Sequence, residues 1–209
     1  TILPKPLVPV RGKPVVIHIM NLFKSEGFKN FFISINHKDN LLKSYLSELR
    51  KIYNIKYIEE KNRLGSAGAL RKINKIKKTF FVINCDSLLN INLKELLNFH
   101  KENKNDITLV ASVKKFNIPY GVCEINTKKG NLVNMSEKPE QRIMANAGLY
   151  VCEEKIFQFL PKKIFFGMNE LIDQLLKKRR KVGVFPIKDR DWKDTGNWMD
   201  YINEVQKNT

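Results

Sequence analysis

The alternation of apolar runs with amphipathic stretches most strongly limits the fold of this chain. In the first half, short runs such as NFFISI (30–35) and TFFVIN (79–84) are typical of buried strands, and 56–59 is a shorter one. Apolar side chains at helical spacing lie before, between and after them, in residues 14–25, 39–52, 66–75 and 93–101. This rhythm predicts an α/β fold with a mostly parallel, Rossmann-like mixed sheet flanked by helices.

The second half has a different pattern. Strands are expected at 107–113, 120–126, 131–136, 145–151 and 182–187, with Lys129-Gly130 as a hairpin signal. Helices are expected at 153–159, 168–180 and 197–206. We therefore expect one domain over residues 1–209, in which a nucleotide-binding-like half (1–105) precedes a more antiparallel substrate half (106–209).

The charge of the chain is strongly positive. The 38 Lys and Arg residues exceed the 21 Asp and Glu residues, which gives a formal net charge of +17. An anionic partner such as nucleic acid, a membrane surface or a phosphorylated small molecule is one explanation. A compositional bias is the other, because lysine is spread along the chain. No zinc-finger, RNP-like or Arg-rich motif accompanies the charge, so we expect no nucleic-acid partner.

Cysteine content and hydropathy indicate the compartment. Three cysteines without CxxC spacing suit free thiols in a reducing environment. No apolar run approaches about 18 residues, and no signal peptide is visible. We expect a cytoplasmic protein without a membrane partner, although a targeting segment before Thr1 stays open.

The segment PKPLVPVRGKP (4–14) places prolines around a cation. Each proline fixes φ and removes a backbone donor, so we expect a stiff, extended connector and no helix. Such a connector would hold Lys5 in one place.

Candidate ligand-binding residues follow the expected strands, since ligands of open α/β sheets collect beyond the carboxyl ends of the strands. In EEKNRLGSAGAL (59–70), Gly65, Ala67 and Gly68 permit close approach to the backbone, and a following helix offers free N–H groups. An ordinary strand-to-helix turn is the alternative.

Two aspartates and a lysine complete the candidates. Asp86 follows a buried run, and Asp194 precedes Thr195-Gly196 and an expected helix, so both could be oxygen ligands of a hard divalent cation. Helix capping or turn formation is the alternative for each aspartate. In SEKPE (136–140), Glu137 and Lys138 are either a solvated charge pair or, for the lysine, an anion-binding group.

Together these segments resemble the sugar-1-phosphate nucleotidylyltransferases (nucleotide-sugar pyrophosphorylases). The similar segments are PKPLVPVRGKP, LGSAGAL, VINCDSLLNINL, YGVCEI, SEKPE, NAGLYV and DWKDTGN. The order of these segments matches that of the family over nearly the whole chain, which makes seven individually weak motifs strong together. The resemblance implies the nucleotide-diphospho-sugar transferase fold, with residues 106–209 as the sugar-phosphate-binding half.

The resemblance also implies an activity. A phosphate oxygen of a sugar 1-phosphate attacks the α-phosphorus of a nucleoside triphosphate, and pyrophosphate leaves as an NDP-sugar forms. Asp86 and Asp194 would hold Mg²⁺, Lys5 would hold the triphosphate, and Lys138 would hold the α-phosphate or the sugar phosphate. Leu64, Gly65, Ser66, Ala67 and Gly68 would line the base. The residues implied for the sugar hydroxyls are Tyr120, Gly121, Glu137, Asn146, Ala147 and Gly148.

A softer similarity, in FFGMNELIDQLLKK and KVGVFPI, points to guanylyltransferases of hexose or glucosamine 1-phosphates. It implies GTP as the nucleotide and synthesis of cell-surface glycan precursors. The resemblance leaves a homo-oligomer and upstream CBS-type regulatory domains open.

The chain departs from the family in three places. The family opens with a strand and a Gly-rich loop, "AGGxGTRLxPLT", whereas this sequence begins at TILPKPL. We therefore expect the first strand of the sheet to lie outside the sequence, before Thr1. Cys85 stands where the family usually has glycine, and Asn197 replaces a more usual Thr, Ser or Arg.

Two other functions remain open. A regulatory protein of the same fold would bind a nucleotide or nucleotide sugar without turnover, whereas a nucleic-acid-binding protein would show steeply salt-dependent binding. Convergence of Asp86, Lys138 and Asp194 in one cleft is the feature that favours the enzyme.

Overall fold

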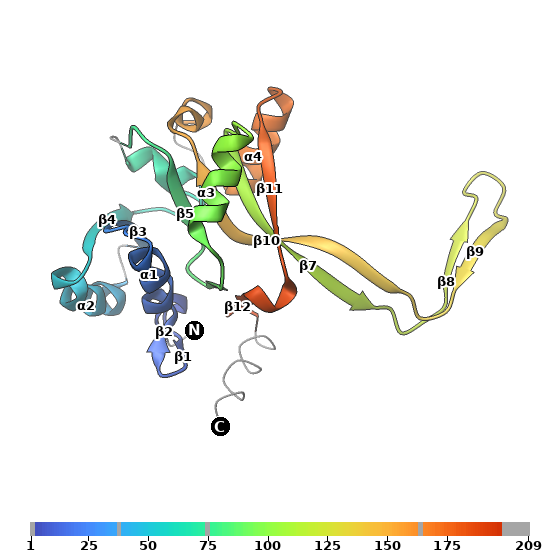
Figure 1. Cartoon of the computed structure of the whole chain (residues 1–209), viewed down its shortest axis with the longest axis horizontal. Coiled ribbons are helices and arrows are strands. Elements are labelled where there is room, and N and C mark those ends of the chain that lie inside the picture. The colour runs from blue at the N-terminus through green and yellow to red at the C-terminus, as the bar shows by residue number, and fades with distance from the viewer. Residues whose placement is uncertain (1–2, 37–38, 74–75, 163–164, 198–209) are drawn as a thin grey trace.

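The computed structural model describes residues 3–36, 39–73, 76–162 and 165–197. It consists of a layered body from which a long two-stranded arm projects (Figure 1). The α-helices are α1 (Val15–Ser25), α2 (Asn40–Glu48), α3 (Leu93–Glu102) and α4 (Met168–Lys177). Short 3-10 helices span Lys5–Leu7, Leu49–Lys51, Gly68–Lys72, Glu154–Phe159 and Asp189–Asp191.

The strands form one larger sheet and several pairs. They are β1 (Pro9–Val10), β2 (Lys13–Pro14), β3 (Asn30–Asn36), β4 (Asn54–Glu60), β5 (Phe80–Ile83), β6 (Ser87–Leu89), β7 (Ile107–Asn117), β8 (Val122–Ile125), β9 (Leu132–Ser136), β10 (Glu140–Cys152), β11 (Val182–Ile187) and β12 (Trp192–Asp194). The four-stranded sheet has the order β11-β7-β10-β5, and β3 pairs in parallel with β4. Because β11 is parallel to β7 and β10 is antiparallel to both β7 and β5, the sheet is mixed. The predicted α/β class with a mixed sheet is confirmed, but the four-stranded sheet is not mostly parallel, because two of its three strand pairings are antiparallel.

Side-chain alternation along β10 builds two cores, one on each face of the sheet. Leu149 and Val151 pack with α1 and α3, whereas Tyr150 and Cys152 pack with α4 and the 3-10 helix that follows β10. This is the two-residue period of a strand whose faces are both covered. The helices therefore flank the sheet on both sides, as the strand–helix rhythm predicts.

A third core joins α2 and the β3–β4 pair to α1. Within the described residues β3 pairs only with β4, and β5 pairs only with β10. One edge of β3 and one edge of β5 are therefore not paired with another described strand. Edge-to-face contacts of Phe81 with Phe23 and Phe28 pack β5 against α1 and the residues that follow it. The further strand expected before Thr1 stays a prediction.

Three local expectations need correction. Lys5–Leu7 form a 3-10 turn inside the proline-rich segment, because prolines at the cap and first-turn positions need no helical N–H. Residues 66–75 give a 3-10 helix at Gly68–Lys72 instead of an α-helix, since Phe166 takes the amides of Ala67 and Gly68. Residues 153–159 are likewise a 3-10 helix. Most of the helix expected at 197–206 lies outside the described residues.

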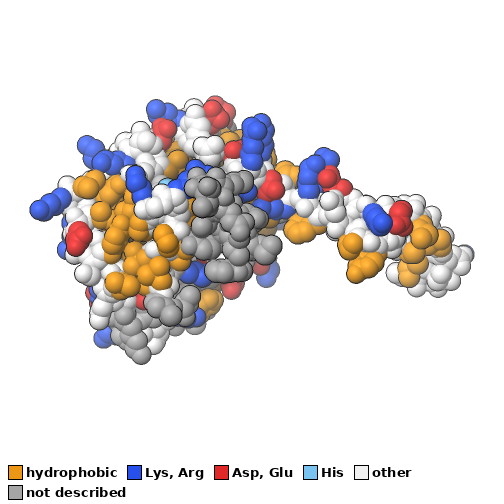
Figure 2. All heavy atoms as spheres, turned by 90° about the horizontal axis from the view of Figure 1, so that it is seen from below, with side chains coloured by type: hydrophobic (Ala, Val, Ile, Leu, Met, Phe, Trp, Pro, Cys, Tyr) orange, Lys and Arg blue, Asp and Glu red, His pale blue; other side chains and the backbone are white. Residues whose placement is uncertain are grey.

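The arm consists of the outer parts of β7 and β10 and the β8–β9 hairpin (Figure 1). Gly130 at φ +68° forms its turn, as the Lys129-Gly130 signal predicts. Hydrophobic side chains are exposed along it (Figure 2), namely Phe116, Tyr120, Ile125, Leu132, Val133, Met135, Ile143 and Met144.

In the part of the chain that the structure describes, no helix has the length and apolar character needed to cross a membrane.

Candidate active site

A short strand pair brings together two aspartates that are far apart in the sequence. Asp86 lies in the turn between β5 and β6, and β6 pairs antiparallel with β12, with Ser87 opposite Asp194. Thr195 adds to the contact between the β5–β6 turn and the end of β12. Both its N–H and its hydroxyl donate to the carbonyl of Asp86, at 2.9 and 3.0 Å. The predicted pair Asp86 and Asp194 therefore lies at one edge of the body.

Gly196 marks the point where the charged groups meet. A Cβ built on Gly196 would lie 2.9 Å from Asp86 Oδ2, 3.0 Å from Asp194 Oδ1 and 3.0 Å from Lys5 Nζ. The Gly196 amide also donates to Asp194 Oδ1 at 2.8 Å, which fixes that carboxylate. We call Lys5, Asp86, Asp194 and Gly196 the acidic junction.

Lys5 reaches the junction from the proline-rich segment. Its Nζ donates to Asp86 Oδ2 at 3.0 Å, and the Asp86 side chain is only 19% exposed. This hydrogen bond, with the carboxylate charge, raises the pKa of Lys5 above its ordinary value. The cation that the prolines were expected to hold in place therefore lies against a carboxylate.

The acidic junction fits a magnesium ion that is shared with a substrate. Among the described residues, no group of three or more His, Cys, Asp or Glu side chains is placed to hold a metal alone. Mg²⁺, however, is commonly bound by one or two carboxylates together with substrate phosphates. The space beside Gly196, which a Cβ would fill, is faced by one oxygen of each aspartate.

Cys85, next to Asp86, differs from a reactive thiol. Cys85 is exposed as a residue, but desolvation of its sulfur and the adjacent Asp86 carboxylate raise the pKa of Cys85 to about 11. The thiol is therefore neutral near pH 7 and a weak nucleophile.

The residues of NAGLYV approach the same edge. The carbonyl of Gly148 accepts from the Asn84 amide at 2.8 Å, and a Cβ on Gly148 would lie 2.6 Å from Asn84 Nδ2. Asn146 is exposed but donates to Tyr150 Oη at 2.7 Å. Ala147 is fully buried. Of the three predicted sugar contacts here, Asn146 alone presents an exposed side chain.

The predicted base-binding residues, Leu64–Gly68, form what we call the nucleotide loop. Ala67 and Gly68 are buried, whereas Leu64 and Gly65 are half-buried and Ser66 is exposed. A cavity of about 580 Å³ lies beside the loop, lined by Glu59, Lys61, Asn62, Leu64 and Lys72. Ligand pockets commonly have such volumes.

The remaining predicted residues lie on the arm. The Lys138 amide donates to the Tyr120 carbonyl at 3.2 Å, and a Cβ on Gly121 would lie 3.1 Å from Glu137 Oε2. These four residues are therefore neighbours. β10 is continuous from Glu140 to Asn146, and at about 3.3 Å per residue this length of strand spans about 20 Å. These four arm residues lie beyond Glu140, at the far end of that length from Asn146. The structure does not bring Lys138 to the acidic junction.

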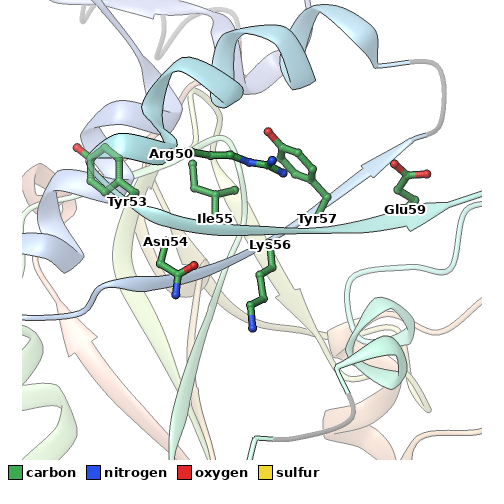
Figure 3. Close-up of a pocket in the computed structure, with 7 residues that line it drawn as sticks. All are labelled: Arg50, Tyr53, Asn54, Ile55, Lys56, Tyr57 and Glu59. Atoms are coloured by element: carbon green, nitrogen blue, oxygen red, sulfur yellow. The ribbon is translucent and has the colours of Figure 1, made fainter.

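A second cavity, of about 600 Å³, lies on the edge strand β4 (Figure 3). The Arg50 guanidinium lies 4.7 Å from the ring centroid of Tyr57, while Asn54 and Lys56 point to the opposite face of the strand. None of the residues that line it belongs to the acidic junction or the nucleotide loop, so we assign no substrate to it.

Comparisons with known proteins show the family of this chain. Residues 1–209 match the model of the nucleotidyl transferase family, so the chain belongs to that family. It is 28% identical to mannose-1-phosphate guanyltransferase 2 of Candida glabrata, over 95% of this chain and 57% of the relative. It is 26% identical to UTP–glucose-1-phosphate uridylyltransferase of Synechocystis sp., over 98% and 58%. The chain thus spans little more than half the length of these relatives.

Solved structures share the fold. HddC from Yersinia pseudotuberculosis has a TM-score of 0.73 at 22% identity, covering 99% of this chain and 91% of that one. The inositol-1-phosphate CTP transferase of T. maritima has a TM-score of 0.70 at 16% identity, covering 98% and 86%. The predicted family and its nucleotidyltransferase fold are confirmed.

Some site features were not singled out from the sequence. Thr195 and Gly196 lie inside the quoted DWKDTGN motif, so the motif itself was the signal that could have identified them. Glu60 and Phe166 lie inside the quoted segments EEKNRLGSAGAL and FFGMNELIDQLLKK, but their contacts with the nucleotide loop were not predicted. The contact of Phe166 joins segments that are separate in the sequence, whereas Glu60 contacts Leu64, four residues further on.

Proposed function

We propose that this protein transfers a nucleoside monophosphate from a nucleoside triphosphate to a sugar 1-phosphate. An oxygen of the sugar phosphate forms a bond to the α-phosphorus. The bond between that phosphorus and the α–β bridging oxygen breaks, and its electron pair leaves with pyrophosphate. The products are an NDP-sugar and pyrophosphate, and the chain itself forms no covalent intermediate.

The acidic junction is the observation that carries the proposal. Two anionic substrates must meet, so catalysis needs positive charge and fixed geometry more than a nucleophile. Asp86 and Asp194 would hold Mg²⁺, which when bound would offset the phosphate charge. The Lys5 side chain is 59% exposed, so it would be accessible to a triphosphate oxygen that replaces its carboxylate partner.

GTP and a hexose or hexosamine 1-phosphate are the proposed substrates. Support comes from the relatives, several of which are named mannose-1-phosphate guanyltransferases. A structure of HddC with GMP-PN, with a TM-score of 0.71, adds to it. The nucleotide loop would contact the base, and Tyr120, Glu137 and Asn146 would contact sugar hydroxyls. We further propose a cytoplasmic role in making precursors of cell-surface glycans.

The test is pyrophosphate release from a matrix of GTP, UTP, CTP, dTTP and ATP against several sugar 1-phosphates, with Mg²⁺ or EDTA. Release with one pair, abolished by EDTA, is expected. Asp194→Ala should lower turnover by about a thousand-fold or more, because a metal ligand is lost. Near-normal turnover by Asp194→Ala would contradict the two-aspartate site.

A second candidate is a regulatory protein that binds a nucleotide or nucleotide sugar without turnover. The observation that speaks for it is the position of Lys138, which lies on the arm beside Tyr120 and Glu137 and not in the acidic junction. Nucleotide binding with no pyrophosphate release from any pair would support this candidate.

A further inference from the structure

The nucleotide loop is held by the segment that begins α4. The Phe166 amide donates to the Leu64 carbonyl at 2.8 Å, and the Phe166 carbonyl accepts from the amides of Ala67 and Gly68, at 3.1 and 2.7 Å. The Met168 amide donates to Ser66 Oγ at 3.0 Å. Four hydrogen bonds thus join two segments that are separate in the sequence.

The two backbones approach so closely that the loop requires glycine. Gly65 has φ +82°, and a Cβ there would lie 2.5 Å from the Phe166 carbonyl oxygen. Phe166 itself is only 9% exposed and belongs to the core that includes Leu171 and Leu175 of α4. The loop therefore packs against a buried support.

Glu60 holds the start of the loop. Its Oε2 accepts from the Leu64 amide at 2.7 Å, and its other carboxylate oxygen accepts from the Ser34 hydroxyl of β3. Glu60 ends β4, so this carboxylate joins the loop to both strands of the β3–β4 pair.

These contacts limit what the loop can recognise. The sequence suggested free N–H groups at this loop. In the structure the amides of Leu64, Ala67 and Gly68 already donate within the protein, so they are not free to bind phosphate. Exposed or half-exposed surface is left to a ligand at Leu64, Gly65 and Ser66, and the three paired amides do not contribute anion-binding donors there.

We propose that Glu60 and the Phe166–Met168 segment are positioning elements for nucleotide recognition. They fix the loop from both ends, so that Leu64, Gly65 and Ser66 present one preformed surface to the base. This inference rests on the proposed function. A preformed surface lowers the ordering cost of binding, and its loss should weaken nucleotide binding selectively.

The experiment compares Glu60→Ala with Glu60→Gln. Loss of the hydrogen bond to Leu64 should raise the KM for the nucleotide and its directly measured Kd about three- to ten-fold. The kcat and the KM for the sugar phosphate should stay within about two-fold of wild type. Glu60→Gln should restore most of the affinity, because its amide oxygen still accepts. Glu26→Ala, which removes a half-buried carboxylate paired with Lys94, should bind nucleotide as wild type does.

An unchanged nucleotide KM and Kd in Glu60→Ala would overturn the inference, as would equal losses for both substrates or no rescue by Gln. If Glu60→Ala fails to fold, Ser66→Ala against Ser66→Thr asks the same question, since only threonine keeps the acceptor of the Met168 amide. A wild-type protein without turnover that still binds nucleotide would contradict the proposed enzyme, while the Kd values would still test the positioning role.

Discussion

Lys5 Nζ lies 3.0 Å from Asp86 Oδ2, at the position where a metal ion would share that carboxylate. The Lys5 side chain is 59% exposed and that of Asp86 is 19% exposed, so the pair is open to solvent on one side. The ammonium therefore offsets the charge of the carboxylate and would compete for it with the proposed divalent cation.

Replacing Lys5 by methionine should strengthen metal binding and weaken nucleotide binding. A partly exposed ion pair contributes roughly 1 kcal/mol, so Lys5→Met should bind Mn²⁺, as a probe for Mg²⁺, about five-fold more tightly without nucleotide. The KM for the triphosphate should rise, because a phosphate-binding cation is lost. Mn²⁺ titration followed by electron paramagnetic resonance measures the first effect. Lys43→Met, which removes a surface pair with Glu59, is the control. Equal Mn²⁺ affinity in wild type and Lys5→Met would show that Lys5 does not share the site.

Gly196→Ala should abolish most activity while the fold persists. The added methyl would lie within 3.0 Å of Asp86 Oδ2 and Lys5 Nζ, displacing both. A shift of about 1 Å in reacting groups can lower turnover about a hundred-fold. Thermal stability should change little, because Gly196 is exposed. The measurements are turnover and the melting temperature.

Gly130→Ala is the matched control for Gly196→Ala. Gly130 has no other atom within 4 Å of its Cβ position, but its φ of +68° strains alanine. It should lower stability by about 1 kcal/mol and leave turnover intact. If Gly196→Ala kept full turnover, the space beside Gly196 would not be where the reacting groups meet.

The sequence predicted two members of the acidic junction, Asp86 and Asp194, as a pair of carboxylates, but not their contacts with Lys5 and Gly196. A carboxylate after a buried run lies at the edge of a sheet, and this rule placed Asp86 correctly. Asp194 was identified as a possible metal ligand from its place in the DWKDTGN motif. The register of β6 with β12, which sets Asp194 opposite Ser87, depends on tertiary pairing that spacing alone does not reveal.

Other features could not be predicted from local pattern. Gly65 and Gly68 looked like the start of an α-helix with free amides, but Phe166, distant in sequence, takes two of those amides. The strands of the arm were predicted as elements, yet alternation along 107–113 and 145–151 does not show that β7 and β10 extend beyond the body. For that reason the distance of Lys138 from Asp86 was not foreseen.

Lys138→Ala should raise the KM for the sugar 1-phosphate about ten-fold and leave the nucleotide KM unchanged, since one charge-assisted hydrogen bond to phosphate is lost. For Lys138 to contribute, the arm must bend toward the body. The irregular register of β10 with β7 between Asn146 and Tyr150 provides a place for this bend. Steady-state kinetics with each substrate varied in turn make the comparison. Lys128→Ala, an exposed lysine at the tip of the same arm, is the control. Identical kinetics in the two variants would exclude Lys138 from sugar-phosphate binding.

His100 should make the fold sensitive to mild acid. Its ring is 1% exposed and lies 2.8 Å from Thr108 Oγ1 and 3.0 Å from Glu153 Oε1. Burial lowers the pKa of His100, and nearby Lys155 adds to this, although Glu153 and Asp106 oppose it. The unfolded chain therefore binds a proton more readily than the fold, and stability is lost as pH falls below the ordinary histidine pKa of about 6.5.

The melting temperature should therefore fall between pH 7.5 and pH 5.5. Titration of Asp106 does not contribute to the loss of stability between pH 7.5 and pH 5.5. Burial opposes its ionisation, but Lys155 and Arg180 hold the pKa of Asp106 below its ordinary value, so its stabilising effect is lost at more acidic pH. His100→Gln should be less stable than wild type at pH 7.5, but its melting temperature should depend less steeply on pH. A wild-type melting temperature that stays constant or rises toward pH 5.5 would mean that the fold does not favour neutral His100.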